Sequence, residues 1–464
     1  MLFRSEYQTV LWDKYHLLYL DGAYGWDQFD ENKVSSRVMD YVAGNLSQTG
    51  ENSVFRTKLC EASMLEYMFA TDNDGTGMLR QASAYMKRHL PEDVAKKMYQ
   101  QYQDGKKAEA DGKTEYSVED ADQAIINAKK EKEQADQNDK EGAPQEEAGE
   151  KNIQDNENNH AQDAEDGKKE SPIQIVLQLK QNALLGMTVS DMSSLSAKAV
   201  EAKDMVSNRQ CETGRYDMKK AEKMNVSDRV MVLEYIGKHF SDYTEPGKGD
   251  LTYEMEYILC GKDTDKKNLE SSIERLMRMR EAANVAHIIA DREKLNQTLM
   301  IATSLAGFSG NPAVVKIVQI GVVAAWAYVE SILDLRTLLS GGKISLIKSA
   351  AEWTTDLKKL GEIVTGEGKA RECKNGLSYQ AYIKQLLFAM KEKKMAYRMM
   401  DIMELAMQKE QNGKNARMDH MIDNMICELR FEAKPLFAKR SLYGDMEMGG
   451  YTFFKRQKLS YINK

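Results

Sequence analysis

Cysteine is scarce in this sequence of 464 residues. The five cysteines lie far apart, are odd in number and never form a CxxC pair, which argues against a zinc knuckle and against a dense disulfide framework. We expect buried thiols, with one disulfide possible if the chain is exported, and the spacing does not identify the pair. The five positions are Cys60, Cys211, Cys260, Cys373 and Cys427.

Motifs for catalysis and for nucleotide binding are missing as well. The six histidines include no HExxH pair that places two imidazoles on one helical face. Every Gly-Lys pair lacks the glycine five positions earlier that a P-loop requires, and before Gly368 that position holds Ile363. The turn from Gly307 to Gly310 lacks the second spacer of a GxSxG nucleophile elbow. We therefore predict no cofactor, and neither acidic turn, at 72–75 or at 263–265, matches a calcium loop.

Strong charge of one sign and long apolar runs are also lacking. The chain has 65 basic and 72 acidic residues and a net charge of -7, without basic clusters interleaved with aromatics, so we predict no nucleic-acid partner. The most apolar run, Ala313 to Leu335, contains Lys316, Gln319 and Glu330. These leave about ten uninterrupted apolar positions, too few to span a bilayer comfortably. We predict a buried core helix there.

One segment differs from the rest in composition. From about residue 104 to residue 171, Lys, Glu, Asp, Gln, Asn and Gly dominate, and aliphatic residues such as Val118 and Ile125 are isolated. Such a stretch buries too little apolar surface to offset its chain entropy. We predict a disordered charged insertion there, with at most a short transient helix around Glu119 to Gln134.

The insertion is expected to interrupt one globular body. Residues 1–103 form the N-terminal part of that body and residues 172–464 form the remainder. If both flanks belong to one fold, deleting residues 106–168 leaves the body intact.

Helical periodicity accounts for most of the body, and extended segments are few. Leu251 to Leu259 alternates apolar and polar residues with the period of a half-buried strand. Residues 427–438 and 451–462 are also extended, and we predict that they pair as a hairpin and join the 251–259 strand in one sheet. Residues 52–70 are extended or mixed. The predicted fold class is α+β: a helix-rich body with a small antiparallel sheet and the long disordered insertion.

One polar group on the apolar helix is a candidate site. Glu330 and Asp334 lie four residues apart on one helical face, and Arg336 follows. Paired carboxylates perform acid and base catalysis when burial drives their pKa values apart. The structural alternative, which we favour, is that Arg336, or Arg278 or Arg280 from the neighbouring long helix, neutralises them, because a buried charge must be paired.

Five stretches of the chain resemble a known family. They are SEYQTVLWDKYHLLYLDGAYG, TDNDGTGMLRQASAYMK, LLGMTVSDMSSLSAKAV, YILCGKDTDKKNLESSIERLMRMREAAN and AAWAYVESILDLRTLLSGGKISLIKSAAEW. They resemble a domain of unknown function in clostridial (Firmicutes) proteins that look like relatives of TadE and TadG. TadE and TadG are pseudopilin-like components of tight-adherence (Tad) pilus systems. The resemblance covers nearly the whole chain outside residues 104–171.

The resemblance implies a setting rather than a reaction. It implies a surface-anchored α+β ectodomain outside the cell, with protein partners in pilus or envelope assembly or in adhesion. A membrane helix is expected just before the segment resembling SEYQTVLWDKY, but only Met1 to Arg4 precede it. We therefore expect a truncated piece or a misplaced start. No catalytic residues are established for the family, so the predicted function is non-catalytic.

Two other functions remain open. A cytoplasmic helical scaffold is favoured by the lack of a visible signal peptide and by the unpaired cysteines. Less favoured is a hydrolase built around Glu330 and Asp334, which requires those carboxylates to open into a cleft that solvent can reach.

Overall fold

The computed structural model describes residues 8–21, 28–48, 57–111, 117–141, 171–216, 224–361, 368–409, 415–433 and 451–460. Contacts within the chain divide it into two units, and each unit is assembled from separate stretches. Unit 1 comprises Met1–Gln101, Ser196–Leu269 and Ile383–Lys464. Unit 2 comprises Tyr102–Leu195 and Glu270–Tyr382, and thus takes in much of the segment that was expected to be an insertion.

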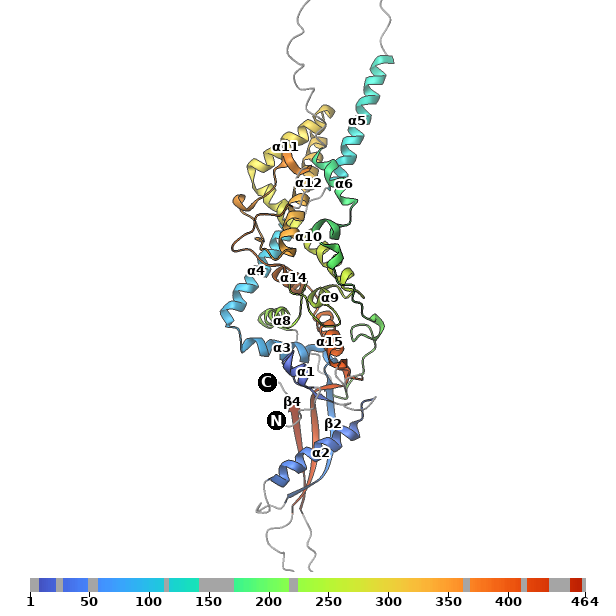
Figure 1. Cartoon of the computed structure of the whole chain (residues 1–464), viewed down its shortest axis with the longest axis vertical. Coiled ribbons are helices and arrows are strands. Elements are labelled where there is room, and N and C mark those ends of the chain that lie inside the picture. Colours follow the sequence, from blue (N-terminus) through green and yellow to red (C-terminus); the bar gives the residue numbers. More distant parts are fainter. Residues whose placement is uncertain are drawn as a thin grey trace, which may run out of the picture. The chain divides into compact units, whose positions relative to one another are not determined.

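Unit 1 contains a small sheet and a set of helices (Figure 1). Its described helices are α1 (Gln8–Asp13), α2 (Glu31–Gln48), α3 (Thr76–Lys87), α8 (Val226–His239), α9 (Glu254–Cys260) and α15 (Glu392–Gln408). Three further helices contain the boundaries between the units: α4 (Glu92–Asp111), α10 (Asp265–Ala290) and α14 (Tyr379–Phe388).

The sheet is antiparallel throughout, and β3 (Met421–Ala433) is its central strand. β2 (Thr57–Phe69) pairs along one edge of β3. On the other edge, β1 (Leu20–Asp21) pairs at the start of β3 and β4 (Tyr451–Ser460) pairs along the rest. The predicted hairpin between residues 427–438 and 451–462 is therefore confirmed.

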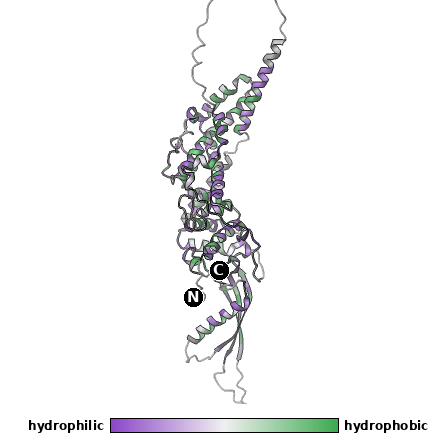
Figure 2. Cartoon of the chain, turned by 45° about the vertical axis from the view of Figure 1, so that its right-hand side comes forward, coloured by the Kyte–Doolittle hydropathy of each residue, from purple (hydrophilic) through white to green (hydrophobic). Residues whose placement is uncertain are grey.

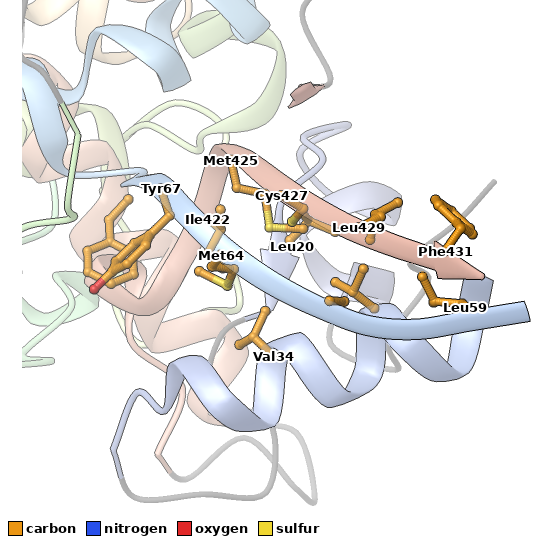
Figure 3. Close-up of a cluster of buried hydrophobic side chains, with 13 residues drawn as sticks. Leu20, Val34, Leu59, Met64, Tyr67, Ile422, Met425, Cys427, Leu429 and Phe431 are labelled. Carbon is orange, nitrogen blue, oxygen red and sulfur yellow. The ribbon is translucent and has the colours of Figure 1, made fainter. Parts of the chain in front are cut away.

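Helix α2 covers one face of this sheet. Alternate residues of β3 from Met425 to Phe431 are buried in this core, as the period of two requires, whereas irregularities in the register of β2 space its buried residues by two or three positions. Val34 and Val38 of the helix pack among them (Figure 3). The buried strand residues include Met64, Ile422 and Met425. The sequence 52–70, expected to be extended or mixed, thus supplies the second long strand of the sheet.

The predicted strand from Leu251 to Leu259 is wrong, because most of this segment forms helix α9. Every residue of α9 is buried, so its alternation of apolar and charged residues does not mark an exposed face. Glu254 and Glu256 instead accept hydrogen bonds inside the unit, from the backbone N–H groups of Ser241 and Tyr243 at 2.9 Å each. The sequence showed the period of a strand because these buried carboxylates alternate with apolar residues, and their hydrogen-bond donors lie elsewhere in the chain.

The spacing of apolar residues from residue 6 to residue 20 predicts an opening helix, but the helix is shorter in the structure. Helix α1 ends at Asp13, and the chain turns at His16, which has a φ of 54°. The N–H groups of His16 and Leu17 donate to the carbonyls of Trp12 and Leu11. These two bonds form a Schellman motif, in which the residue with positive φ is usually glycine. Because histidine occupies that position here, the local sequence does not predict where the helix ends.

Unit 2 is built around helix α12 (Pro312–Leu339). From Gly321 to Leu335 all of its residues are buried, which confirms the predicted core helix. Among the described residues it is the one helix that is long and apolar enough to cross a membrane, but 61% of its most apolar window is buried. The other described helices of the unit are α5 (Val118–Glu141), α6 (Pro172–Lys180), α7 (Leu184–Thr188) and α11 (Arg292–Ala306).

Helix α5 corrects the expected insertion. Its 24 residues lie inside the segment 104–171, and the described outer part of the helix is mainly hydrophilic (Figure 2). A narrow stripe of Val118, Ala121, Ile125 and Ala128 is nevertheless buried. These residues repeat every three or four positions, so one helical face packs on α12 while the charged face remains in solvent. Residues 142–170 lie outside the described residues.

Candidate functional site

Glu330 and Asp334 project from α12 into the interior of unit 2, where both side chains are fully buried. Lys348 forms ion pairs with both, and its Nζ lies 2.5 Å from Oδ1 of Asp334. The backbone N–H groups of Thr354 and Thr355 donate to the two Glu330 oxygens, at 3.1 and 2.9 Å. Glu330 therefore fixes the segment after α12 through three donors.

Arg280 of α10 is the second cation of this group. Its Nη2 lies 2.9 Å from Oδ2 of Asp334, and the side chains of both residues are fully buried. Its Nη1 donates to the carbonyls of Ser345 and Leu346 and to the hydroxyl of Tyr382, and its Nε donates to Oδ2 of Asp334 at 3.0 Å. Five donors in a rigid fork suit such a buried position, because nearly all of them must find acceptors.

The expected role of Arg336 is not observed. Its Nε donates to the carbonyl of Met187 at 2.8 Å and its Nη1 to that of Gly368, while Arg280 and Lys348 pair with the carboxylates. Arg280 was one of the alternatives open from the sequence, and Lys348 was missed. Lys348 lies in an irregular segment after the turn at 341–342, where no periodicity assigns a facing side.

We call Glu330, Asp334, Arg280 and Lys348 the buried charge cluster. Two anions face two cations in a setting that excludes bulk water, and the carboxylate oxygens already have N–H donors or cations beside them. An ion cluster of this kind depends on each partner, because removal of one leaves an uncompensated buried charge. Its arrangement is that of a structural element, because none of the four side chains has exposed area.

A groove of about 450 Å³ lies in unit 1. Leu251, Ile402 and Leu405 supply apolar wall. Two ion pairs lie in it, Lys14 with Glu254 at 3.4 Å and Lys409 with Asp250 at 2.9 Å. Mixed apolar and paired polar walls suit a small ligand or a peptide side chain.

Three of the six histidines converge in unit 1, although they are scattered in sequence. The ring centroids of His16, His89 and His239 lie 4.6, 4.3 and 5.4 Å from that of Tyr85. Burial lowers the pKa of His239 to about 4, and Nδ1 of its ring lies 2.9 Å from the carbonyl oxygen of Lys14. The sequence carries one signal for this histidine cluster, a tyrosine four residues before His89 and another before His239.

Metal and thiol chemistry find little support in the described part of the chain. No group of three or more His, Cys, Asp or Glu side chains there is arranged to hold a metal ion. All five cysteines are free. Burial raises the pKa of the Cys211 and Cys427 thiols to about 11, so neither is an activated nucleophile.

The model of a family of unknown function, DUF5702, matches residues 162–433, which is more than half of the chain. The chain belongs to this family. The DUF5702 match includes the buried charge cluster and β3, whereas α2, β2 and β4 lie outside it. Comparisons with curated proteins and with solved structures found no match. Membership of a family of unknown function was predicted from the resemblance and is confirmed.

Proposed function

We propose that this chain is the non-catalytic ectodomain of a cell-surface protein associated with a Tad-type pilus, and that it acts in assembly or adhesion. The observation that carries the proposal is the closure of the buried charge cluster. Glu330 and Asp334 were the one constellation in the sequence with the chemistry for acid and base catalysis, and the structure gives each of them cationic partners in the interior.

Acid and base catalysis by a carboxylate pair needs contact with substrate and a difference in protonation between the two groups. At zero exposed side-chain area, Glu330 and Asp334 meet protein donors instead of solvent. This supports a protein that works through its folded surface. The sequence resemblance to relatives of TadE and TadG supports the setting.

A second candidate function is a cytoplasmic helical scaffold. The five free cysteines favour it, because exported proteins commonly pair their thiols. Cys260, Cys373 and Cys427 are buried, however, and buried thiols are protected from oxidation in either compartment. The cysteines are therefore compatible with export too.

Localisation of the full-length gene product separates the two functions. The protein is expressed with a C-terminal epitope, and intact cells are treated with a protease that does not cross the membrane. An ectodomain is degraded in intact cells and co-purifies with envelope or pilus components after crosslinking. Full protection in intact cells, with degradation only after lysis, would refute the surface assignment and establish the scaffold.

A further inference from the structure

Strand β4 leaves one edge of the sheet open. It pairs with β3 from Tyr451 opposite Ala433 to Ser460 opposite Asn424, and no other described strand pairs with it. In an antiparallel edge strand, alternate residues direct their N–H and C=O groups away from the sheet. β4 therefore presents ten residues of backbone, roughly 33 Å at about 3.3 Å per residue, with a row of outward hydrogen-bonding groups.

The side chains of β4 are divided along its length. Tyr451, Phe453 and Phe454 lie in the first half and are 56%, 43% and 63% exposed, although Phe453 stacks on Phe431 of β3. Three basic residues, Lys455, Arg456 and Lys458, follow from the middle of the strand toward its end, and the strand contains no acidic residue. An edge with aromatic contacts at one end and three positive charges at the other has a polarity that a partner can recognise.

We propose that the open edge of β4 is a docking site for an extended acidic segment of a partner protein, which adds to the sheet as a further antiparallel strand. Main-chain hydrogen bonds hold such a strand, and its side chains select it. In an antiparallel pairing, the N-terminal half of the partner strand lies beside the basic C-terminal part of β4, and its C-terminal half lies beside the aromatic N-terminal part. We therefore expect acidic residues in the N-terminal half of the partner strand and apolar residues in its C-terminal half.

The charges argue against a second copy of this chain as the occupant. Two β4 strands paired antiparallel about their centre place Lys455 of each copy opposite Arg456 of the other, and like charges directly opposite each other are destabilising. Lysines on an edge strand have this protective effect against self-association. The same lysines attract an acidic strand, so one set of residues both excludes the copy and recruits the partner.

The probe is a ten-residue peptide in which Glu alternates with Thr in the first half and Val alternates with Thr in the second. We expect it to bind the full chain, to lose affinity as salt is raised, and to slow amide hydrogen exchange within β4. Peptides with Lys in place of Glu, or with one central Pro that removes a ladder donor, are expected to bind at least tenfold more weakly. Equal binding of the Pro peptide would overturn strand addition.

The variant that tests the charges is Lys455→Glu with Lys458→Glu, which leaves the Arg456 pair with Glu428 in place. It is expected to weaken the acidic peptide at least tenfold and to bind the Lys peptide instead. The matched control is Lys203→Glu with Lys266→Glu, the same charge change at exposed sites of unit 1, with binding unchanged. A β4 variant that binds the acidic peptide as the wild type does would refute the proposal.

Two other occupants are outcomes of the same experiment. Concentration-dependent dimerisation that removes peptide binding assigns the edge to a second copy. Basic and aromatic residues together also suit an anionic membrane, so the chain is incubated with phosphatidylglycerol vesicles. Vesicle binding that displaces the acidic peptide, and that Lys455→Glu with Lys458→Glu abolishes, assigns the edge to a lipid surface. Either result overturns the acidic-strand proposal.

Discussion

The buried charge cluster of unit 2 and three more open regions of unit 1 hold their ionisable groups in opposite ways. In unit 2, the buried charge cluster places two carboxylates against two cations with no exposed side-chain area. In unit 1, the groove, the histidine cluster and the basic half of β4 leave charged or titratable groups at least partly in contact with solvent. The cluster therefore stabilises unit 2, whereas the groups that contact solvent are accessible to protons and to other molecules. Changes in unit 2 are accordingly expected to have larger effects on stability than changes at the open groups of unit 1.

The largest effect is expected from loss of α5. Replacing residues 117–134 with Gly/Ser of equal length removes the buried stripe that includes Val118 and Ile125. We expect the free energy of unfolding to fall by about 4–6 kcal/mol, since each large aliphatic side chain contributes about 1.5–3 kcal/mol and helical order is lost too. Denaturant unfolding measures the change.

The matched replacement is of residues 143–160, eighteen positions of the charged stretch outside the described residues. We expect it to change stability by less than about 0.5 kcal/mol, because its composition offers little apolar surface for burial. Similar losses from both replacements would show that the boundary between the packed helix and the charged stretch lies elsewhere. If instead only the first replacement is destabilising, the expectation that all of residues 106–168 are dispensable is wrong, and the dispensable part begins near residue 141.

The next effect is expected in the buried charge cluster. Lys348→Met leaves Glu330 and Asp334 with one fewer cation in the interior, and we expect a loss of about 3–5 kcal/mol. Lys267→Met is the surface control: its pair with Asp263 is 3.0 Å long but about half exposed, and it should cost less than about 1 kcal/mol. Thermal unfolding of both variants tests the contrast, and equal shifts in Tm would mean that the cluster is open to water.

The sequence predicts an element of the fold correctly when the residues that determine it lie close together in the chain. The core helix and the hairpin follow from periodicity, because their signals lie within a few residues. Helix α14 has a local signal too: Ser378, the residue before it, accepts a hydrogen bond from the N–H of Ala381, as a capping serine does. The error at Leu251 to Leu259 has a distant cause, since Glu254 and Glu256 are satisfied by the backbone of residues 241–243.

The candidate site was predictable in kind but not in composition. Burial of Glu330 and Asp334 on an apolar helix implied that cations must face them, and Arg280 was among the choices. Lys348 comes from an irregular segment, and Arg336 points to main-chain carbonyls. Similarly, α5 was missed because two of its four buried residues are alanines, which barely raise the apolar content of a charged stretch.

The α5–α12 contact offers a test at one position. A Cβ atom at Gly321 would lie 2.0 Å from Cβ of Ala121, so Gly321→Ala forces the helices apart. We expect a loss of about 1–3 kcal/mol despite the better helix propensity of alanine. Adding Ala121→Gly should restore most of it. The control is Gly44→Ala in α2, where nothing lies within 4 Å, and a gain of about 0.5–1 kcal/mol is expected.

The smallest effect, and the one that belongs to the open groups of unit 1, is a pH dependence from the histidine cluster. Burial, with lesser contributions from His16, Lys238 and His89, lowers the pKa of His239 to about 4, below an unfolded value of about 6.5. Between these values the unfolded chain binds more protons than the folded one, so stability is lost as the pH falls from 6.5 toward 4.

Because the His239 ring is only partly buried, solvent screening reduces this contribution, and we expect about 1–2 kcal/mol. In His239→Asn the side-chain amide nitrogen takes the position of Nδ1, from which it can donate to the carbonyl of Lys14, so stability at pH 7 should match the wild type while the slope between pH 6.5 and 4 becomes shallower. His16, whose pKa burial also lowers, leaves a residual slope. An unchanged slope in the variant would show that His239 stays open to protonation in the folded chain.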